Sequence, residues 1–154
     1  MRLHLLRHAE PEQFSNTSND KTRELGHYGL QQCEQLKEQL DRDWSTTTLF
    51  CSTATRTLQT MRKSLNLSSF SQVHLLDELY LAPLPSLLSF LSQTKDSTDL
   101  FIIGHNNGLS DLVQYVTDLP IILQTGHYVC LDFQLDHWNE VSRGLASLQA
   151  EFVP

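Results

Sequence analysis

Two histidines in this chain each follow directly after a short apolar run. The run 3–6 ends in Arg7 and His8, and the run 100–103 leads into His105. An imidazole can attack phosphorus, and an arginine offers a planar set of donors that matches phosphate oxygens. We expect both runs to be buried strands that aim their imidazoles at one point, where a phosphoryl group would fit.

Further phosphate-competent groups follow another predicted strand and the start of a helix. Ser52 comes directly after the apolar, β-branched run 47–51, and Arg56 stands one turn into the helix expected next. Asn106 follows His105 where a further helix should begin, and a helix N-terminus offers free N–H groups to an anion. Each of these groups alone is more often a structural residue than a ligand-binding one. The prediction of a phosphate site therefore depends on these strand ends lying close together.

Short apolar runs predict six strands. They are expected at residues 3–6, 47–51, 73–76, 101–103, 128–135 and 147–153. The run 101–103 shows no polar alternation, which is typical of a strand covered on both faces. The alternation of strands and helices predicts an α/β fold: a three-layer sandwich with helices on both faces of a mostly parallel sheet and an antiparallel pair at its end. We expect a single domain over residues 1–154.

Helical periods separate these strands. The first helix is expected from Gly29 onward, Ser52 and Thr53 fit the N-cap of the second, a third should open at Pro83 or Pro85, and a fourth should run over residues 107–118. The expected buried residues are Leu30, Cys33, Leu36 and Leu40 in the first helix, and Leu58, Met61 and Leu65 in the second.

Composition narrows the function classes. The 154 residues carry a formal net charge of −7, which argues against binding nucleic acid or an anionic membrane surface. Three cysteines without a C-x-x-C pair favour a reducing compartment over a disulfide framework. The apolar run at the N-terminus is too short for a signal peptide, and no run approaches the ~20 residues of a membrane span. We expect a cytoplasmic protein.

The remaining histidines favour structural roles. His4 should point into the packing, and the others stand without companions in predicted loops and strands: His27, His74, His127 and His137. A metal site would need paired ligands at helical or loop spacing, so we expect neither a metal nor another cofactor. A serine hydrolase is also disfavoured, because the sequence has no G-x-S-x-G elbow.

The segments around these chemical groups resemble three motifs of the histidine phosphatase superfamily, which includes the phosphoglycerate mutases. Residues 6–10 resemble its L-R-H-G/A motif, residues 51–60 its S-x-A-x-R-A-x-Q-T segment, and residues 103–110 its G-H-N-P-G-L-S segment. The resemblance spans most of the chain and implies a phosphoglycerate mutase-like fold. Because the long insertions that build a cap in mutases are missing, we expect a minimal cap.

Other segments resemble the phosphohistidine phosphatase SixA group of that superfamily. They are residues 20–25 (D-x-x-R-P-L), residues 79–88 (L-Y-x-A…L-L), and a tail with Thr125-Gly126 and Asp136-x-Trp138. The resemblance implies that His8 takes the phosphoryl group. It also implies that the equatorial oxygens are held by Arg7, Arg56 and His105. From their strand-end positions we add Ser52 and Asn106 as substrate-binding candidates.

The family also favours an acidic proton donor after the third strand, and Glu78 is the best positional match, with Asp77 as its rival. The chain departs from the family pattern at three positions, Gly26, Thr53 and Asn107. Phe14 stands six residues after His8, where mutases carry an asparagine. This difference argues against a phosphoglycerate substrate.

Together, these features predict a metal-independent phosphatase that works through a phosphohistidine enzyme intermediate. The first expected substrate is phosphohistidine on a signalling or phosphocarrier protein. The alternative is a small-molecule phosphomonoester, such as a sugar or nucleotide phosphate. A non-catalytic phosphate-binding module is a third possibility, disfavoured by the retention of His8, Arg7, Arg56 and His105.

Overall fold

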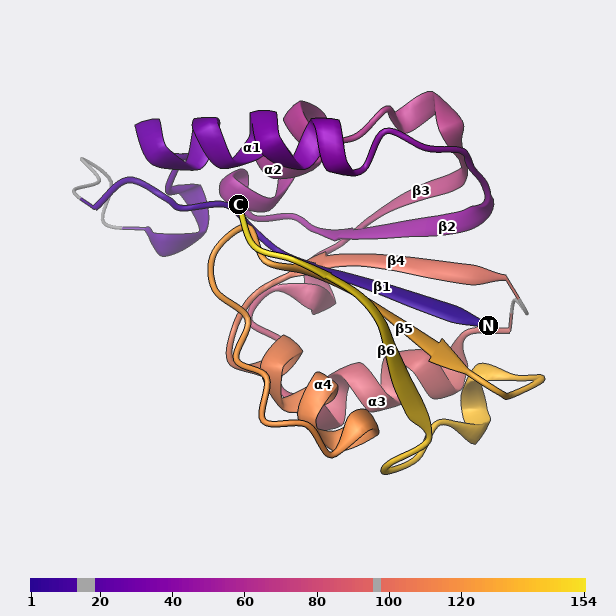
Figure 1. Cartoon of the computed structure of the whole chain (residues 1–154). Coiled ribbons are helices and arrows are strands. Elements are labelled where there is room, and N and C mark those ends of the chain that lie inside the picture. Colours follow the sequence, from indigo (N-terminus) through magenta and orange to yellow (C-terminus); the bar gives the residue numbers. More distant parts are fainter. Residues whose placement is uncertain (14–18, 96–97) are drawn as a thin grey trace.

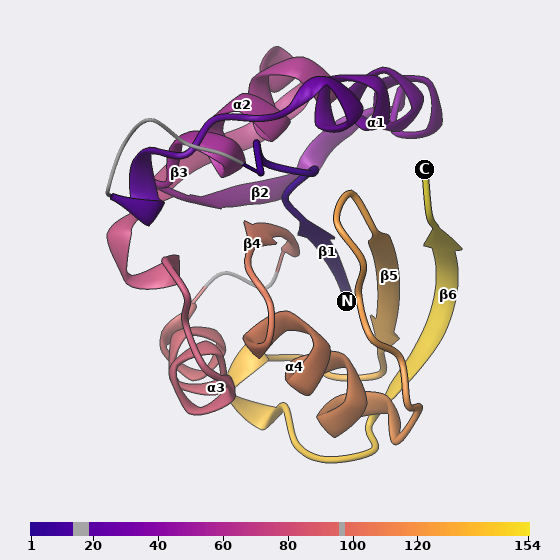
Figure 2. The same ribbon diagram turned by 90° about the vertical axis from the view of Figure 1, so that its left-hand side faces the viewer.

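The computed structural model describes residues 1–13, 19–95 and 98–154. One sheet, with the strand order β3-β2-β4-β1-β5-β6, forms its middle layer (Figures 1 and 2). The strands are β1 (Arg2–Arg7), β2 (Trp44–Ser52), β3 (Phe70–Leu76), β4 (Asp99–Gly104), β5 (Tyr128–Phe133) and β6 (Ala146–Phe152). The helices are α1 (His27–Gln39), α2 (Thr55–Ser64), α3 (Leu84–Gln93) and α4 (Gly108–Thr117). Four short 3-10 helices are η1 (Asp20–Thr22), η2 (Leu67–Ser69), η3 (Asp77–Leu79) and η4 (Trp138–Glu140).

Helices cover both faces of the sheet, with α1 and α2 on one face and α3 and α4 on the other (Figure 2). The pairs β1–β4, β2–β4 and β2–β3 are parallel, whereas β1–β5 and β5–β6 are antiparallel. This arrangement confirms the predicted α/β sandwich with a mostly parallel sheet.

Parallel pairing brings the chemically important strand ends together. Arg7 at the end of β1 lies opposite Gly104 at the end of β4. Cys51, one residue before the end of β2, lies opposite Ile103 of β4. The carboxyl ends of these three strands therefore meet at one edge of the sheet, which is where open α/β sheets bind their ligands.

An apolar core lies on each face of the sheet and holds the layers together. The core under α1 and α2 includes Leu36, Met61 and Phe101, and the core under α3 and α4 includes Leu91 and Ile102. All five side chains are at most 2% exposed, and burying a side chain of this size contributes roughly 1.5–3 kcal/mol. These cores anchor the strands whose ends form the edge described above.

The helix starts differ from the predictions in instructive ways. Leu30 is 37% exposed, because α1 begins at His27 and turns Gly29, Gln32, Cys33 and Leu36 inward instead. The prediction that Ser52 and Thr53 cap α2 is wrong, because β2 continues through Ser52 and the N-cap is Ala54. Leu58 of the predicted buried stripe is only half-buried.

Proline starts α3 as predicted, with Pro83 at the N-cap and Pro85 in the first turn. The fourth helix follows the prediction closely, since α4 is flanked by Asn107 and Asp118 as its caps. Among the described residues, no helix has the length and apolar character needed to cross a bilayer.

Candidate active site

A polar pocket of about 470 Å³ lies at the carboxyl edge of the sheet. Five predicted site residues line it: Arg7, His8, Arg56, His105 and Asn106. They come from the ends of β1 and β4 and from the first turn of α2. The structure therefore brings together the two imidazoles and the two guanidinium groups that the sequence analysis placed around one anion.

Backbone contacts fix the position of His8 just beyond β1. Its N–H donates to the carbonyl oxygen of Gly104 at 3.2 Å, and its own carbonyl accepts from the N–H of Gly126 at 3.0 Å. The next residue is tied to α2, because the N–H of Ala9 donates to Oγ1 of Thr60 at 3.0 Å. His8 is thus held from both sides of the sheet end.

The hydrogen bonds of the His8 ring select one tautomer. Nδ1 lies 2.8 Å from the carbonyl oxygen of Ala9, and a carbonyl oxygen only accepts, so Nδ1 carries the hydrogen. Nε of Arg56 donates to Nε2 of His8 at 3.2 Å. The lone pair of Nε2 is therefore the nucleophilic site of this ring.

Burial keeps that imidazole uncharged. It lowers the pKa of His8 to about 3, and the nearby His105, Arg56 and Arg7 act in the same direction, against the hydrogen bond to Ala9. At neutral pH the ring is therefore uncharged and Nε2 carries no proton, which is the form that can attack phosphorus.

Arg56 is buried at the centre of the pocket, with 3% of its surface exposed. Besides the bond to His8, its Nη2 lies 3.4 Å from Nδ1 of His105. Its Nη1 donates to the backbone oxygen of Asp20 at 2.6 Å, and its Nη2 donates to Oδ2 of Asp20 at 2.9 Å. One edge of the guanidinium thus faces the two imidazoles, while Asp20 holds the other side.

Ser52 supports His105 from behind rather than lining the pocket. Its fully buried Oγ lies 2.8 Å from Nε2 of His105. A hydroxyl both donates and accepts, so Ser52 can partner either tautomer of that ring. When Ser52 donates, Nδ1 of His105 carries the hydrogen and offers a donor on the side of Arg56. Burial, followed by the charge of Arg56, lowers the pKa of His105 to about 3.

The guanidinium of Arg7 has a hydrogen-bond donor without a partner among the described residues. Its Nη1 donates to the carbonyl oxygen of Leu123 at 2.9 Å. Its Nε is buried and has no hydrogen-bond partner in the described part of the chain. Burial lowers the pKa of this guanidinium, and the carboxylate of Glu10 opposes that effect. An orphaned buried donor beside two imidazoles fits a site for an oxyanion.

Asp20 and Tyr80 belong to the site, although the sequence analysis gave them no role. The hydroxyl of Tyr80 donates to Oδ2 of Asp20 at 2.7 Å. Together with Arg56 and Arg23, this bond lowers the pKa of Asp20 to about 2. The Tyr80 ring also stands edge-on to His105, with 5.3 Å between ring centroids. Both residues lay within segments matched to the SixA group, which was the available signal.

Comparisons with known proteins identify the family. A sequence profile described as Histidine phosphatase superfamily (branch 1) matches residues 3–80, which include β1, β2 and the first turn of α2. The chain belongs to the histidine phosphatase superfamily. It is a phosphatase of that superfamily, and the motif resemblance is confirmed. No curated protein sequence matches the chain at a significant level.

Solved structures of this superfamily share the fold over nearly the whole chain. A candidate phosphohistidine phosphatase SixA from Nakamurella multipartitia is 21% identical, with a TM-score of 0.82, covering 99% of this chain and 95% of that one. A protein histidine phosphatase SixA complexed with tungstate is 18% identical, with a TM-score of 0.72 and coverage of 98% and 96%. A phosphoserine phosphatase mutant from Entamoeba histolytica, in complex with phosphoserine, is 14% identical, with a TM-score of 0.66 and coverage of 97% and 95%.

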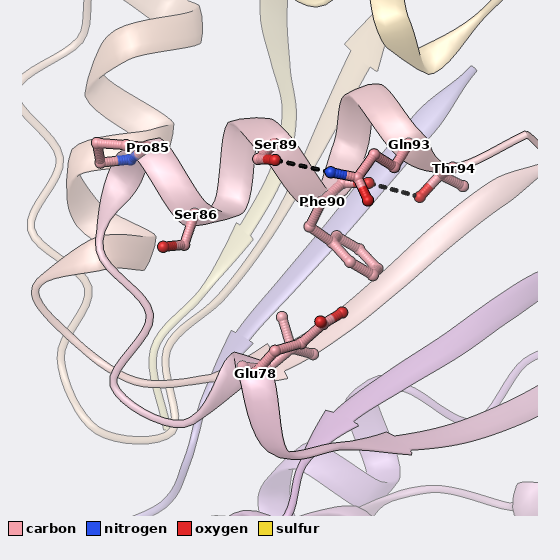
Figure 3. A pocket seen from close by; sticks show the side chains of 8 residues that line it. Glu78, Pro85, Ser86, Ser89, Phe90, Gln93 and Thr94 are labelled. Carbon is pink, nitrogen blue, oxygen red and sulfur yellow. Dashed lines mark hydrogen bonds between the residues drawn. The ribbon is translucent and has the colours of Figure 1, made fainter.

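The structure does not bring Glu78, the expected proton donor of this histidine phosphatase, to the pocket that contains His8. Glu78 lies in η3 and lines a second pocket of about 530 Å³, formed with α3. Figure 3 shows its side chain extending toward Phe90 of α3. Leu81, three residues later, lines the His8 pocket instead. Its rival Asp77 is exposed and receives hydrogen bonds from Lys21 and Thr53.

Asn106 lines the pocket, but its side chain is engaged elsewhere. Nδ2 donates to the carbonyl oxygen of Leu123 at 3.0 Å, and Oδ1 accepts from the hydroxyl of Ser110 at 2.7 Å. Asn106 therefore braces the segment after α4 against the start of that helix. Phe14, on which the argument against phosphoglycerate rested, lies outside the described residues.

Histidines outside the pocket are mostly packed or paired. His4 is buried as predicted, and its Nδ1 lies 2.8 Å from the hydroxyl of Tyr128. The prediction that His127 has no companion is wrong, because its Nε2 lies 2.9 Å from Oε1 of Glu151 on β6. In the described ranges, no group of three or more His, Cys, Asp or Glu side chains is placed to hold a metal ion.

Proposed function

We propose that this chain removes the phosphoryl group from phosphohistidine on a signalling or phosphocarrier protein, without a metal, as a single domain over residues 1–154. One observation carries the proposal: the neutral Nε2 of His8 stands against Nε of Arg56 at 3.2 Å, in a pocket lined by a second arginine and a second imidazole.

The reaction proceeds by two displacements at phosphorus. Nε2 of His8 attacks in line, the bond from phosphorus to the substrate nitrogen breaks, and its electron pair leaves with the substrate imidazole. Water then attacks phospho-His8, and His8 leaves with its Nδ1 hydrogen still donated to Ala9 at 2.8 Å. Because His8 keeps that hydrogen, it departs as a neutral imidazole, which is a weakly basic leaving group.

Side chains supply the positive charge that phosphoryl transfer requires. Arg56 points one guanidinium edge at His8 and His105, and Arg7 has a buried Nε without a partner among the described residues. Donors held in place before the reaction stabilise the charge that spreads over the equatorial oxygens. This set of cationic donors is the basis for proposing a metal-independent reaction.

Two features favour a phosphohistidine substrate. A departing imidazole needs less proton donation than a departing alkoxide, and the residue expected to be the donor, Glu78, lines a different pocket. The rim of the pocket also carries an apolar side chain, Leu81, which is 50% exposed. An exposed leucine beside the pocket suits contact with the protein that presents the phosphohistidine.

A small phosphomonoester is the second candidate. The fold shared with a phosphoserine phosphatase bound to phosphoserine favours it. The arginines and imidazoles that line the pocket would bind any phosphoryl group.

The discriminating experiment compares kcat/KM for a purified phosphohistidine carrier protein with values for a panel of sugar, nucleotide and amino-acid phosphates. We expect the phosphohistidine protein to be turned over with the highest kcat/KM. A higher kcat/KM for any ester of the panel would refute the proposal in favour of the second candidate.

A further inference from the structure

Glu10 presents a carboxylate at the wall of the His8 pocket, where its negative charge favours the cationic form of Arg7. Both Glu10 and Thr125 line the pocket, and the hydroxyl of Thr125 donates to Oε2 of Glu10 at 2.7 Å. In the described part of the chain, no residue donates a hydrogen bond to Oε1 of Glu10. One carboxylate oxygen is therefore anchored and the other is available.

Hydrogen bonds hold the backbone of Glu10, so the position of its Cα atom, from which the side chain extends, is fixed. Its N–H donates to Oε1 of Gln32 at 2.8 Å, and Nε2 of the same glutamine donates to the carbonyl oxygen of Thr125 at 2.8 Å. On the other side, the N–H of Gly26 donates to the carbonyl oxygen of Glu10 at 3.0 Å. Gln32 thus ties Glu10 and Thr125 to α1 as one unit.

The approach of α1 to this segment requires a glycine. A Cβ atom on Gly29 would lie 2.1 Å from the carbonyl oxygen of Glu10. Gly29 therefore lets α1 pack directly on the Glu10 backbone. A larger residue at this position would force α1 away from Glu10.

The other acidic groups near the site are already committed. Oδ1 of Asp20 pairs with Arg23 at 3.2 Å, and Oδ2 accepts from Arg56 and from Tyr80 at 2.9 and 2.7 Å. Both oxygens of Asp20 thus already accept hydrogen bonds, from two arginines and a tyrosine hydroxyl. Glu78 lines the separate pocket beside α3. Of the two carboxylates that line the His8 pocket in the described part of the chain, only Glu10 has an oxygen that accepts no hydrogen bond from a described residue.

We propose that Glu10 is the carboxylate that handles the leaving group and the attacking water. This inference rests on the proposed function and adds the residue that discriminates the substrate. A phosphorylated imidazole is a good leaving group only when its other nitrogen carries a hydrogen, because it then departs as neutral imidazole rather than as an anion. Oε1 of Glu10 accepts the hydrogen bond from that second nitrogen and favours the protonated ring.

The second displacement uses the same position. Water takes the place of the departed imidazole, in line with the bond between phosphorus and Nε2 of His8. As the oxygen of water bonds to phosphorus, one of its protons passes to Oε1 of Glu10, and the electron pair of the breaking bond returns to Nε2. Glu10 then gives the proton to solvent or to the departing phosphate, so protons and charge balance over the cycle.

The test is Glu10→Gln, which keeps the shape and loses the charge. Glu12→Gln is the matched control, because Glu12 is exposed and does not line the pocket. With a phosphohistidine carrier, we expect Glu10→Gln to lower kcat/KM by about 10²–10⁴-fold, the usual size of general acid–base help. Glu12→Gln should match the wild type.

A second measurement separates chemistry from structural damage. With an aryl phosphate whose phenolate leaves without proton donation, Glu10→Gln should form phospho-His8 at a rate within about threefold of wild type. It should then hydrolyse phospho-His8 about 10²-fold more slowly. A burst of phenolate and an accumulated phosphoenzyme would be seen in rapid quench. Inorganic phosphate should bind at least as tightly as to wild type, because a repelling carboxylate is gone.

Three results would overturn the inference. They are an unchanged kcat/KM in Glu10→Gln, an equal slowing of phosphoenzyme formation and breakdown together with weaker phosphate binding, or the predicted pattern in Glu78→Gln instead. The failure of the proposed function looks different: the wild-type protein itself would turn over no phosphohistidine, while the aryl phosphate measurement would still report on Glu10.

Discussion

Nε of Arg56 donates to Nε2 of His8 across 3.2 Å, and Nε2 is the nitrogen that attacks phosphorus in the proposed reaction. The same contact requires an unprotonated Nε2, which agrees with the bond between Nδ1 and Ala9 at 2.8 Å. A phosphoryl group arriving at Nε2 would therefore meet the edge of the guanidinium as it bonds.

The fork geometry of Arg56 should be irreplaceable. Lysine carries the charge but cannot donate to His8 and to both acceptor oxygens of Asp20 in one plane. Arg56→Lys is expected to lower kcat by about 10²–10³-fold, as for the loss of one preorganised donor. Arg62→Lys, on the exposed face of the same helix, is the control. Near-normal turnover by Arg56→Lys would show that only the charge matters.

The hydroxyl of Ser52 should be needed for His105 to offer a hydrogen to the phosphoryl group. Ser52→Ala leaves Nε2 of His105 without its 2.8 Å partner in a buried position. An unsatisfied buried group costs about 1–3 kcal/mol, so urea denaturation should show a loss in that range. Turnover should fall as well, whereas Ser52→Thr, which keeps the hydroxyl, should recover part of it. Equal activity in Ser52→Ala and wild type would remove Ser52 from the account.

Acid should destabilise the protein through its buried histidines. The pKa values of His4, His8 and His105 are lowered to about 3 from 6.5, chiefly by burial. Below pH 6.5 these imidazoles bind protons in the unfolded chain but not in the folded protein. The free energy of unfolding therefore falls as the pH drops from 6.5 toward 3. Above pH 6.5 this contribution is complete.

The measurement is urea denaturation between about pH 7 and pH 5. His105→Asn should reduce the slope of stability against pH by at most about 1.4 kcal/mol per pH unit. His74→Gln, at an exposed position, should leave the slope as in wild type. A slope that His105→Asn does not change would mean that the ring is charged in the folded protein.

Turnover should survive a chelator, because Arg7 and Arg56 supply the charge that a metal would otherwise supply. The assay is kcat on the phosphohistidine carrier before and after dialysis against EDTA. Activity lost in EDTA and restored by Mg²⁺ or Mn²⁺ would show that the charge-neutralising groups have been misread.

The sequence predicted the strands and the meeting of Arg7, His8 and His105 in one pocket for a physical reason. Buried parallel strands appear as apolar runs, and their carboxyl ends meet at one edge, so Arg7, His8 and His105 follow from local patterns. What joins segments far apart in the chain was not predictable in this way. Asp20 and Arg56 are 36 positions apart in the sequence, and no local spacing predicts that they pair.

The sequence also did not predict the direction in which a side chain points within a loop. Glu78 sits at the expected distance along the chain, but η3 turns its side chain toward α3, and Leu81 reaches the pocket instead. The pairing of His127 with Glu151 likewise depends on β6 returning beside β5. Position in the sequence limits where a residue can be, whereas the turn decides which way it faces.

The central claim is that His8 receives the phosphoryl group. The most direct measurement is rapid quench of the wild-type protein with a carrier phosphorylated by labelled phosphate, followed by peptide mapping. We expect a transient label on His8 that is labile in acid and stable in base. We also expect no label and no turnover in His8→Ala, with the fold retained. A label on another residue, or turnover by His8→Ala at the wild-type rate, would contradict it.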